Sequence, residues 1–333
     1  MSEAITVAHP RDVYGFDHGQ AAEVAFADAL ARGRLHHAWM LVGPEGVGKA
    51  TFAYRAARRL MGARAERALG LLGSSPDDPV SRQISARSHP DLMVLERIGD
   101  DGKARKSIPV DEARRLPEFF SKAPAASPFR VAIIDAVDDM NVNAANALLK
   151  TLEEPPERGV LFLISHSPGG LLPTIRSRCR RLRFPPWSEA DAADFLSRHL
   201  SLNAEEVLRL AKMAGGAPGR GLTLAAADAL TLERAAHDIL RRLPDIEPAP
   251  LQALTDGFRG AEGAARFELL FERLAAQVHA QALERARNAV PSDRWFTVWE
   301  RLVRLPQQVE AVNLDRGDAF WTAMAELRAA ARS

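Results

Sequence analysis

Length, composition and charge limit what this chain can be. Its 333 residues suggest two or three domains with a sizeable core. Hydrophobic residues make up 47% of the chain and charged residues 26%, which excludes a disordered or fibrous protein. The 44 basic and 43 acidic residues give a net charge of +1, so a bulk attraction to nucleic acid or to a membrane surface is excluded.

Cysteine content and hydropathy predict the compartment. Cys179 is the one cysteine, which excludes an intrachain disulfide framework and a cysteine-rich metal site. The first ten residues lack the basic and apolar regions of a signal peptide, and no apolar run reaches the length of about 18 residues that a membrane span needs. We therefore expect a cytoplasmic protein with no membrane partner.

The first half of the chain alternates predicted helices and strands. Apolar residues recur with a helical period over 17–35, where Gly33 is placed to end the helix. Short apolar runs bounded by turn residues predict strands at 38–42, 92–95, 131–135 and 160–165. This alternation favours a three-layer α/β domain with a largely parallel sheet and flanking helices.

Strand signals stop near 184–187, and the rest of the chain has the pattern of helices separated by Gly and Pro. A glycine-rich stretch at 215–219 and a proline-rich linker at 243–250 divide this helical part. The pattern predicts an α/β domain at 1–185, a small helical domain at 186–242 and an all-helical domain at 243–333.

One helix of the last domain has a distinct apolar face. Ser292 is expected to cap it, and Trp295, Trp299, Leu302 and Val303 form the stripe. We interpret this stripe as core or as a subunit contact, with an aromatic ligand cage as the alternative.

A glycine-rich loop, GPEGVGKAT at 43–51, follows the first predicted strand. It fits the G-x-x-x-x-G-K pattern, in which backbone N–H groups surround phosphates and the lysine reaches the outer ones. The candidate nucleotide contacts in this loop are Gly43, Gly46, Gly48, Lys49 and Thr51.

The loop lacks one group that a magnesium-nucleotide site needs. The position after Lys49 should carry a hydroxyl for Mg²⁺, but Ala50 has no oxygen. Thr51 comes one residue late and projects about 100° further around the helix. A glycine turn that binds no ligand therefore stays open as the alternative.

A second magnesium-organising element is also incomplete. The apolar run 131–134 ends in Asp135, a candidate nucleotide-site residue. Proteins that hydrolyse ATP normally place Glu after this Asp to activate the attacking water, whereas this chain has Ala136. Asp138 and Asp139 come too late to take that place, so we expect slow or absent hydrolysis.

Two further segments stand out between 146 and 183. The segment NALLKTLEEPP at 146–156 predicts a helix ended by two prolines. The segment Arg176–Arg183 holds five arginines in eight residues. A solvated basic face is one interpretation, and a surface that contacts a partner's nucleotide or DNA is the other, because arginine's planar fork grips phosphate.

These motifs together resemble a family. A phosphate loop, NALLKTLEEPP and the Ser177-Arg178-Cys179 triplet at these spacings are similar to bacterial clamp-loader subunits of the AAA+ class. Because Ala50 and Ala136 replace catalytic groups, the chain is more similar to the delta-prime subunits of DNA polymerase III than to the ATP-hydrolysing gamma/tau subunits. The resemblance implies an AAA+ domain, a helical lid domain and a C-terminal collar domain that oligomerises.

The resemblance also implies roles for individual residues. Arg178 matches the arginine finger that acts in trans on the ATP site of a neighbouring subunit. Ser165 and His166 align with the first sensor strand, and Arg220 lies one place late for the second sensor arginine. Many relatives carry a four-cysteine zinc module after the phosphate-loop helix, but 61–90 holds no cysteine, so we expect no zinc and no metal site.

The function implied is that of a stator-like, non-motor clamp-loader subunit that helps to load the sliding clamp on primed DNA. Its implied partners are the gamma/tau and delta subunits, the clamp indirectly, and primer-template DNA in the assembled ring. No cofactor is expected to be required, and weak ATP binding stays open. We expect no polymerase activity and little or no ATPase activity, and whether the chain counts as an enzyme stays open.

An ATP-hydrolysing gamma/tau-like motor subunit is the alternative, and it predicts magnesium-dependent turnover. A kinase with an unrelated phosphate loop has no support, since the sequence shows neither an acceptor site nor a catalytic lid.

Overall fold

A computed structural model describes residues 5, 7–16, 18–98 and 105–332. The chain forms two compact units, one over Thr6–Leu222 and one that includes Thr223–Ser333. The division into three domains at 1–185, 186–242 and 243–333 stays a prediction.

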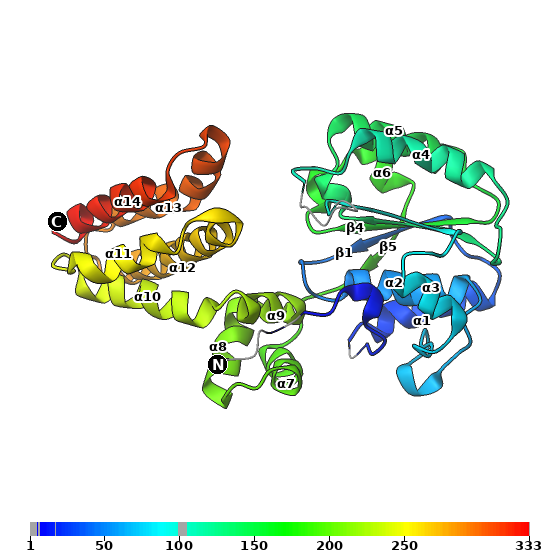
Figure 1. Cartoon of the computed structure of the whole chain (residues 1–333), viewed down its shortest axis with the longest axis horizontal. Coiled ribbons are helices and arrows are strands. Elements are labelled where there is room, and N and C mark those ends of the chain that lie inside the picture. Colours follow the sequence, from blue (N-terminus) through cyan, green and yellow to red (C-terminus); the bar gives the residue numbers. More distant parts are fainter. Residues whose placement is uncertain (1–4, 6, 17, 99–104, 333) are drawn as a thin grey trace. The chain divides into compact units, whose positions relative to one another are not determined.

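A five-stranded parallel sheet forms the centre of the first unit (Figure 1). Its order is β2-β3-β4-β1-β5, so β2 and β5 are the edge strands. The strands are β1 (Ala38–Val42), β2 (Leu92–Glu96), β3 (Arg130–Asp135), β4 (Gly159–Ser165) and β5 (Arg180–Arg183). The predicted α/β fold is confirmed, and four strands lie within one residue of their predicted bounds. The fifth, β5, was not predicted.

Helices cover both faces of this sheet (Figure 1). One face carries α1 (Gln20–Ala31), α2 (Lys49–Leu60) and α3 (Pro79–Ser85), and the other carries α4 (Val110–Ser121), α5 (Val142–Glu153) and α6 (Pro173–Ser177). Along β4, Phe162 joins the core under α1 and α2, whereas Leu161 and Leu163 join the core under α4 and α5. Both faces of the strand are therefore apolar, as is typical of a parallel sheet.

Three helices complete the first unit and reach its border. They are α7 (Glu189–His199), α8 (Ala204–Ala214) and α9 (Pro218–Ala226). Ser188 caps α7, and Asn203 begins α8 with a capping box that includes Glu206. Gly215 ends α8 with a φ of +60°, a conformation that glycine adopts without steric cost.

The second unit is all-helical, as predicted. Its helices are α10 (Ala229–Arg242), α11 (Pro248–Asp256), α12 (Gly260–Arg287), α13 (Asp293–Val312) and α14 (Arg316–Ala331). Phe258, Phe267, Phe271 and Phe320 pack edge-to-face or tilted against one another in its core.

The predicted apolar stripe on α13 is only partly buried within the chain. Trp295 and Leu302 are buried, but Val303 is 51% exposed. Position 303 lies about 80° around the helix from position 295, at the margin of the stripe. Ser292 occupies the cap position without a side-chain cap hydrogen bond.

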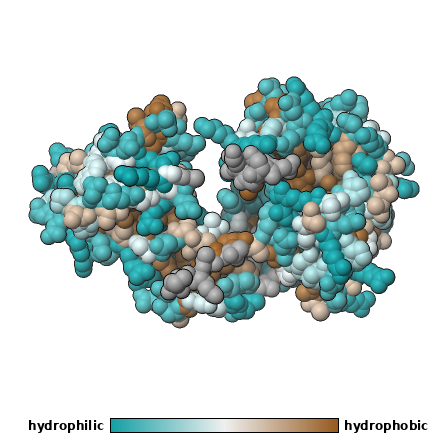
Figure 2. All heavy atoms as spheres, in the orientation of Figure 1, coloured by the Kyte–Doolittle hydropathy of each residue, from teal (hydrophilic) through white to brown (hydrophobic). Residues whose placement is uncertain are grey.

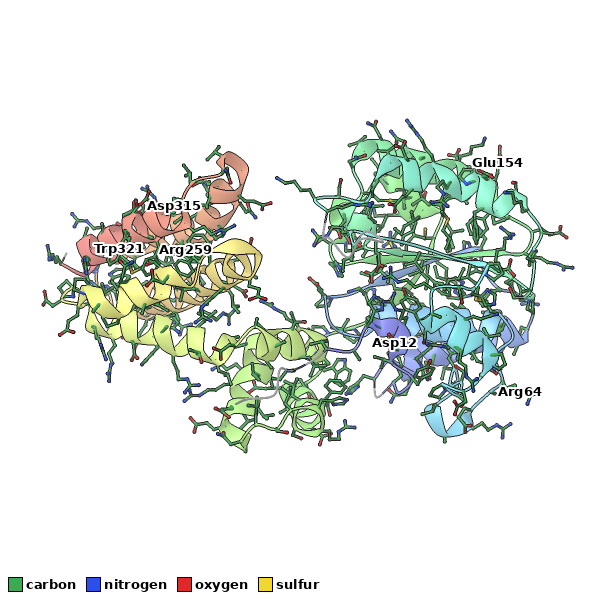
Figure 3. The ribbon with its side chains drawn as sticks, in the orientation of Figure 1. Asp12, Arg64, Glu154, Arg259, Asp315 and Trp321 are labelled. Carbon is green, nitrogen blue, oxygen red and sulfur yellow. The ribbon has the colours of Figure 1, made fainter. Side chains whose placement is uncertain are left out.

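The surface of the second unit has two notable regions. Figure 2 shows a hydrophobic patch over the connection between α13 and α14, where Val312 and Leu314 are exposed. A cavity of about 430 Å³ is lined by residues of α11, α12 and α14 and of the segments just before α12 and α14, among them Arg259, Asp315 and Trp321 (Figure 3). Its lining carries both signs of charge, which does not favour one class of ligand.

Candidate functional site

The glycine-rich loop joins β1 to α2, as a phosphate loop does. Gly46 has a φ of +82° and Gly48 a φ of +99°, values that glycine adopts easily. A Cβ on Gly43 would lie 2.1 Å from the carbonyl oxygen of Phe184, so that position admits no side chain. The ring of Phe16 packs beside Gly48.

The loop also packs against the start of α9. The backbone N–H of Gly219 donates to the carbonyl oxygen of Gly46 at 2.8 Å. A Cβ on Gly46 would lie 2.4 Å from the backbone nitrogen of Arg220. Arg220, in the first turn of α9, therefore lies directly against the loop, and its role as a sensor arginine stays a prediction.

Lys49 is buried at the first turn of α2 and is 3% exposed. Its ammonium group donates to the carbonyl oxygens of Gly43 and Pro44, at 2.5 Å each, and lies 3.0 Å from Nδ1 of His166. Burial lowers the pKa of Lys49 to about 8, against the opposing effect of nearby carboxylates such as Asp135.

The carboxyl ends of β1, β3 and β4 meet beside this lysine. Val42 pairs with Ser165, and Asp135 pairs with Ile164 in the same register. Burial and, after it, the neighbouring carboxylate of Glu96 raise the pKa of Asp135 to about 6, while Lys49 opposes both. The sheet thus gathers Lys49, Asp135 and Ser165 from three distant parts of the sequence.

Asp138 holds the end of β4. Its carboxylate accepts hydrogen bonds from Ser165 Oγ at 3.0 Å, from the His166 N–H at 2.7 Å and from the Ser167 N–H at 3.1 Å. The hydroxyl of Ser165 is therefore directed at Asp138, inside the chain.

The positions that would complete a magnesium site are filled by Ala50 and Ala136, with Thr51 one residue later. Ala136 is 2% exposed and packs in the core under α2. Thr51 lies in the first turn of α2 and is partly buried. Ala50 and Ala136 present a methyl group where the Mg²⁺ hydroxyl and the catalytic Glu were expected, so the residues present do not fit a complete magnesium-nucleotide site.

Arg178 lies just before the edge strand β5, at the end of the sheet opposite to the glycine-rich loop. It lies between α6 and β5. The first residue of β5, Arg180, pairs with Trp39 near the amino end of β1, whereas the glycine-rich loop leaves the carboxyl end of β1. Its guanidinium donates to the carbonyl oxygen of Thr174 at 3.0 Å and forms an ion pair with Glu153 at 3.0 Å. Its side chain is 36% exposed, so a partner molecule has access to it.

Three other arginines of this segment lie on the edge strand β5, whereas Arg176 lies in α6. Arg180 lies over the ring of Trp39 at 4.8 Å, while Arg181 and Arg183 are exposed on β5. Charged side chains on an edge strand discourage pairing with another strand. The structure therefore gives these arginines a structural explanation beside a phosphate-binding one.

Two features are absent from the described ranges. Among residues 5, 7–16, 18–98 and 105–332, no group of three or more His, Cys, Asp or Glu side chains is arranged to hold a metal ion. Within the same ranges, every helix is too short or too polar to cross a membrane. The expectation of no zinc stays a prediction.

Comparison with known proteins gives the chain a family. Residues 19–188, more than half of the chain, match the family model described as DNA polymerase III, delta subunit.

The chain belongs to this family.

Individual relatives agree with this assignment. The chain is 38% identical to the DNA polymerase III subunit delta' of Pseudomonas aeruginosa over 188 residues, which are 56% of this chain and 55% of that protein. It is 34% identical to the DNA polymerase III subunit gamma of Buchnera aphidicola over 187 residues, which are 56% of this chain and 48% of that one. The chain thus spans about half the length of these curated relatives. The resemblance to delta-prime subunits is confirmed.

A solved structure with a related description was also found. It is a DNA polymerase III, gamma subunit-related protein of Thermotoga maritima, with 18% identity and a TM-score of 0.49. The comparison covers 91% of this chain and 98% of that one.

Sequence reasoning missed three contacts in this member of the DNA polymerase III delta family. These are the contact of Lys49 with His166, the clamp of Asp138 on the end of β4, and the ion pair of Arg178 with Glu153. Each joins residues that are far apart in the sequence and carries no local signal. The shared carboxyl edge of parallel strands could have placed His166 near Lys49, because both follow strands that neighbour each other.

Proposed function

We propose that this chain is a non-motor, stator-like subunit of the bacterial clamp loader in the DNA polymerase III holoenzyme. In this role it acts in the cytoplasm, helps to load the sliding clamp on primed DNA, and supplies Arg178 to the ATP site of a neighbouring motor subunit. Its neighbours in the ring would be gamma/tau and delta subunits, with primer-template DNA bound by the assembly.

The observation that carries the proposal is the state of the phosphate loop. Ala50 and Ala136 lack the oxygen atoms that hydrolysis needs, and Lys49 is engaged by atoms of its own chain. A subunit built in this way is poorly suited to hydrolyse ATP itself. It retains, however, an accessible arginine at the opposite end of its sheet.

The geometry around Arg178 supports action on a partner. Since the loop leaves the carboxyl end of β1 and Arg178 precedes the start of a parallel strand, the arginine cannot reach its own loop. An arginine supplied in trans stabilises the charge that develops on the transferred phosphoryl group.

A reconstituted ring tests this role. We expect Arg178→Ala to lower hydrolysis at the adjacent motor site by about 10³-fold or more, without loss of ring assembly. Arg178→Lys should retain little more of this hydrolysis than Arg178→Ala does, because an ammonium group lacks the planar fork of a guanidinium. Arg181→Ala is the matched control, since it removes an exposed arginine from the same edge. Clamp-stimulated hydrolysis that is unchanged in Arg178→Ala would refute the assignment.

A motor subunit is the second candidate. The similarity to gamma subunits favours it, together with Thr51 at the position after Ala50. Magnesium-dependent turnover by the chain alone separates the two functions.

A further inference from the structure

The ammonium group of Lys49 has its donors committed inside the chain. A protonated lysine offers three N–H donors. The structure gives this one three acceptors: the carbonyl oxygens of Gly43 and Pro44 and the Nδ1 atom of His166. A phosphate oxygen can bind Lys49 only if one of these contacts breaks.

The three acceptors differ in origin. The two carbonyl groups belong to the loop itself and move with it. The imidazole comes from the residue after β4, which is 117 positions away in the sequence. It lies directly after Ser165, on the side where the carboxyl ends of β3 and β4 meet. His166 is therefore the acceptor that another part of the chain brings to the lysine.

His166 is held firmly in this position. Asp138 accepts hydrogen bonds from the backbone N–H groups of His166 and Ser167 and from the hydroxyl of Ser165. Burial lowers the pKa of His166, and the nearby ammonium of Lys49 lowers it further. A neutral imidazole that keeps its proton on Nε2 presents the Nδ1 lone pair to Lys49.

We propose that the Nδ1 atom of His166 takes the place of a phosphate oxygen on Lys49. The loop is thereby prevented from binding the triphosphate chain of a nucleotide. Removal of the imidazole leaves one N–H donor of Lys49 available, and the loop can then bind a polyphosphate. The inference deepens the proposed non-motor function, because it names the residue that keeps the loop closed.

Binding of inorganic tripolyphosphate and of ATP to the full chain tests the inference, measured by titration calorimetry without magnesium. We expect His166→Ala to bind both ligands at least about tenfold more tightly than the unmodified chain, since a charge-assisted hydrogen bond becomes available. His166→Asn should show no gain, because its Oδ1 atom lies about where Nδ1 does and still accepts from Lys49. His199→Ala, which alters an exposed histidine of α7, should bind as the unmodified chain does.

A second substitution links the gain to the lysine. In the double variant Lys49→Ala/His166→Ala, the gain in affinity should disappear. The inference is overturned if His166→Ala does not bind more tightly than the unmodified chain, if the gain survives without Lys49, or if His166→Asn binds as tightly as His166→Ala. Failure here leaves the proposed function standing, because the ring assay on Arg178 does not depend on this loop.

Discussion

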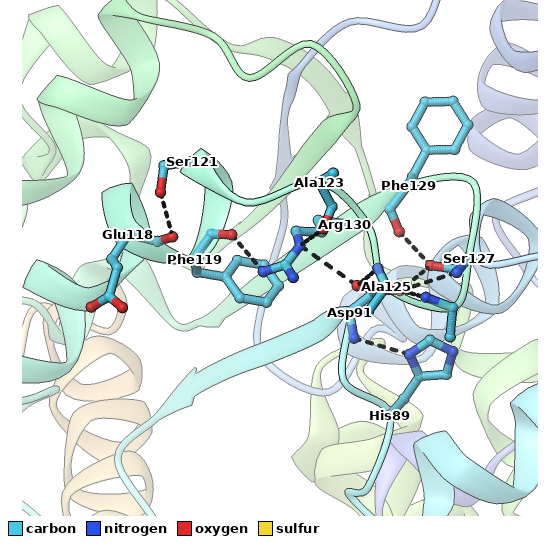
Figure 4. A network of polar contacts seen from close by, with 11 residues as sticks. His89, Asp91, Glu118, Phe119, Ser121, Ala123, Ala125, Ser127, Phe129 and Arg130 are labelled. Atoms are coloured by element: carbon cyan, nitrogen blue, oxygen red, sulfur yellow. Dashed lines mark hydrogen bonds and ion pairs between the residues drawn. The ribbon is translucent and has the colours of Figure 1, made fainter.

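Asp91 shows how much one buried side chain organises in this protein. It is fully buried between β2 and the loop before β3, and its carboxylate accepts hydrogen bonds from the N–H groups of Ala125, Ala126 and Ser127 and from Ser127 Oγ (Figure 4). Arg130 lies 3.5 Å away and closes the network. Burial alone would raise the pKa of Asp91, but these hydrogen bonds outweigh it and lower the pKa below its usual range.

The first prediction concerns this carboxylate. Asp91→Asn should lower the free energy of unfolding by about 2–4 kcal/mol at pH 7, because buried donors lose a charged acceptor. Since the pKa is lower in the folded state, the contribution is complete above the unfolded pKa of about 3.9 and is lost as the pH falls toward the folded value. Chemical unfolding from pH 7 to pH 3 should therefore show the gap between the two proteins shrinking below about pH 4.

An exposed carboxylate provides the control for this experiment. Asp77, whose side chain is 90% exposed, pairs with Arg82 at the surface. Asp77→Asn should change the free energy of unfolding by no more than about 0.5 kcal/mol at any pH in the series. A loss for Asp91→Asn that stays constant down to pH 3 would contradict the hydrogen-bonded carboxylate.

At the scale of elements, the phosphate loop contacts the first turn of α9. Gly46 has a positive φ and no room for a Cβ beside Arg220, whereas Gly33 has a similar φ of +63° and open space around it. Comparison of the two glycines separates the backbone cost of alanine from the steric cost of the contact.

The second prediction uses this pair. Gly33→Ala and Gly46→Ala should both lose about 1–2 kcal/mol of stability from the left-handed backbone. Gly46→Ala should lose about 1–3 kcal/mol more, because the loop and α9 must separate. Hydrogen exchange at the Gly219 amide, which donates to Gly46, should accelerate in Gly46→Ala alone. Equal exchange in both variants would mean that the contact contributes nothing.

The elements differ in how well the sequence predicted them. The buried strands were predicted because parallel strands that are covered on both faces are continuous apolar runs, as in Gly159–Ser165. β5 was missed because three of its four residues are arginines, and its pairing with β1 is specified by tertiary contacts. The phosphate-loop motif predicted a loop between β1 and α2. The contact of His166 with Lys49 joins residues that follow two different strands, and no local pattern encodes it.

At the scale of the whole molecule, the question is whether the chain works alone or only through partners. Its first unit holds a loop with an engaged lysine, two alanines at positions where hydrolysis needs oxygen atoms, and an accessible arginine at the far end of the sheet. Its second unit is all-helical and carries exposed apolar residues such as Val312 and Leu314. These features favour a subunit whose activity depends on an assembly.

The third prediction follows from that dependence and separates the stator from the motor. The purified full chain should release phosphate from ATP no faster with magnesium than without it, and Lys49→Ala should leave that background rate unchanged. Neither result is expected of a motor, in which the P-loop lysine and Mg²⁺ stabilise the transferred phosphoryl group and their loss costs several kcal/mol of transition-state free energy. Magnesium-dependent turnover that Lys49→Ala abolishes would show that Thr51 and another acid replace the missing groups, and the chain would then be a motor subunit in its own right.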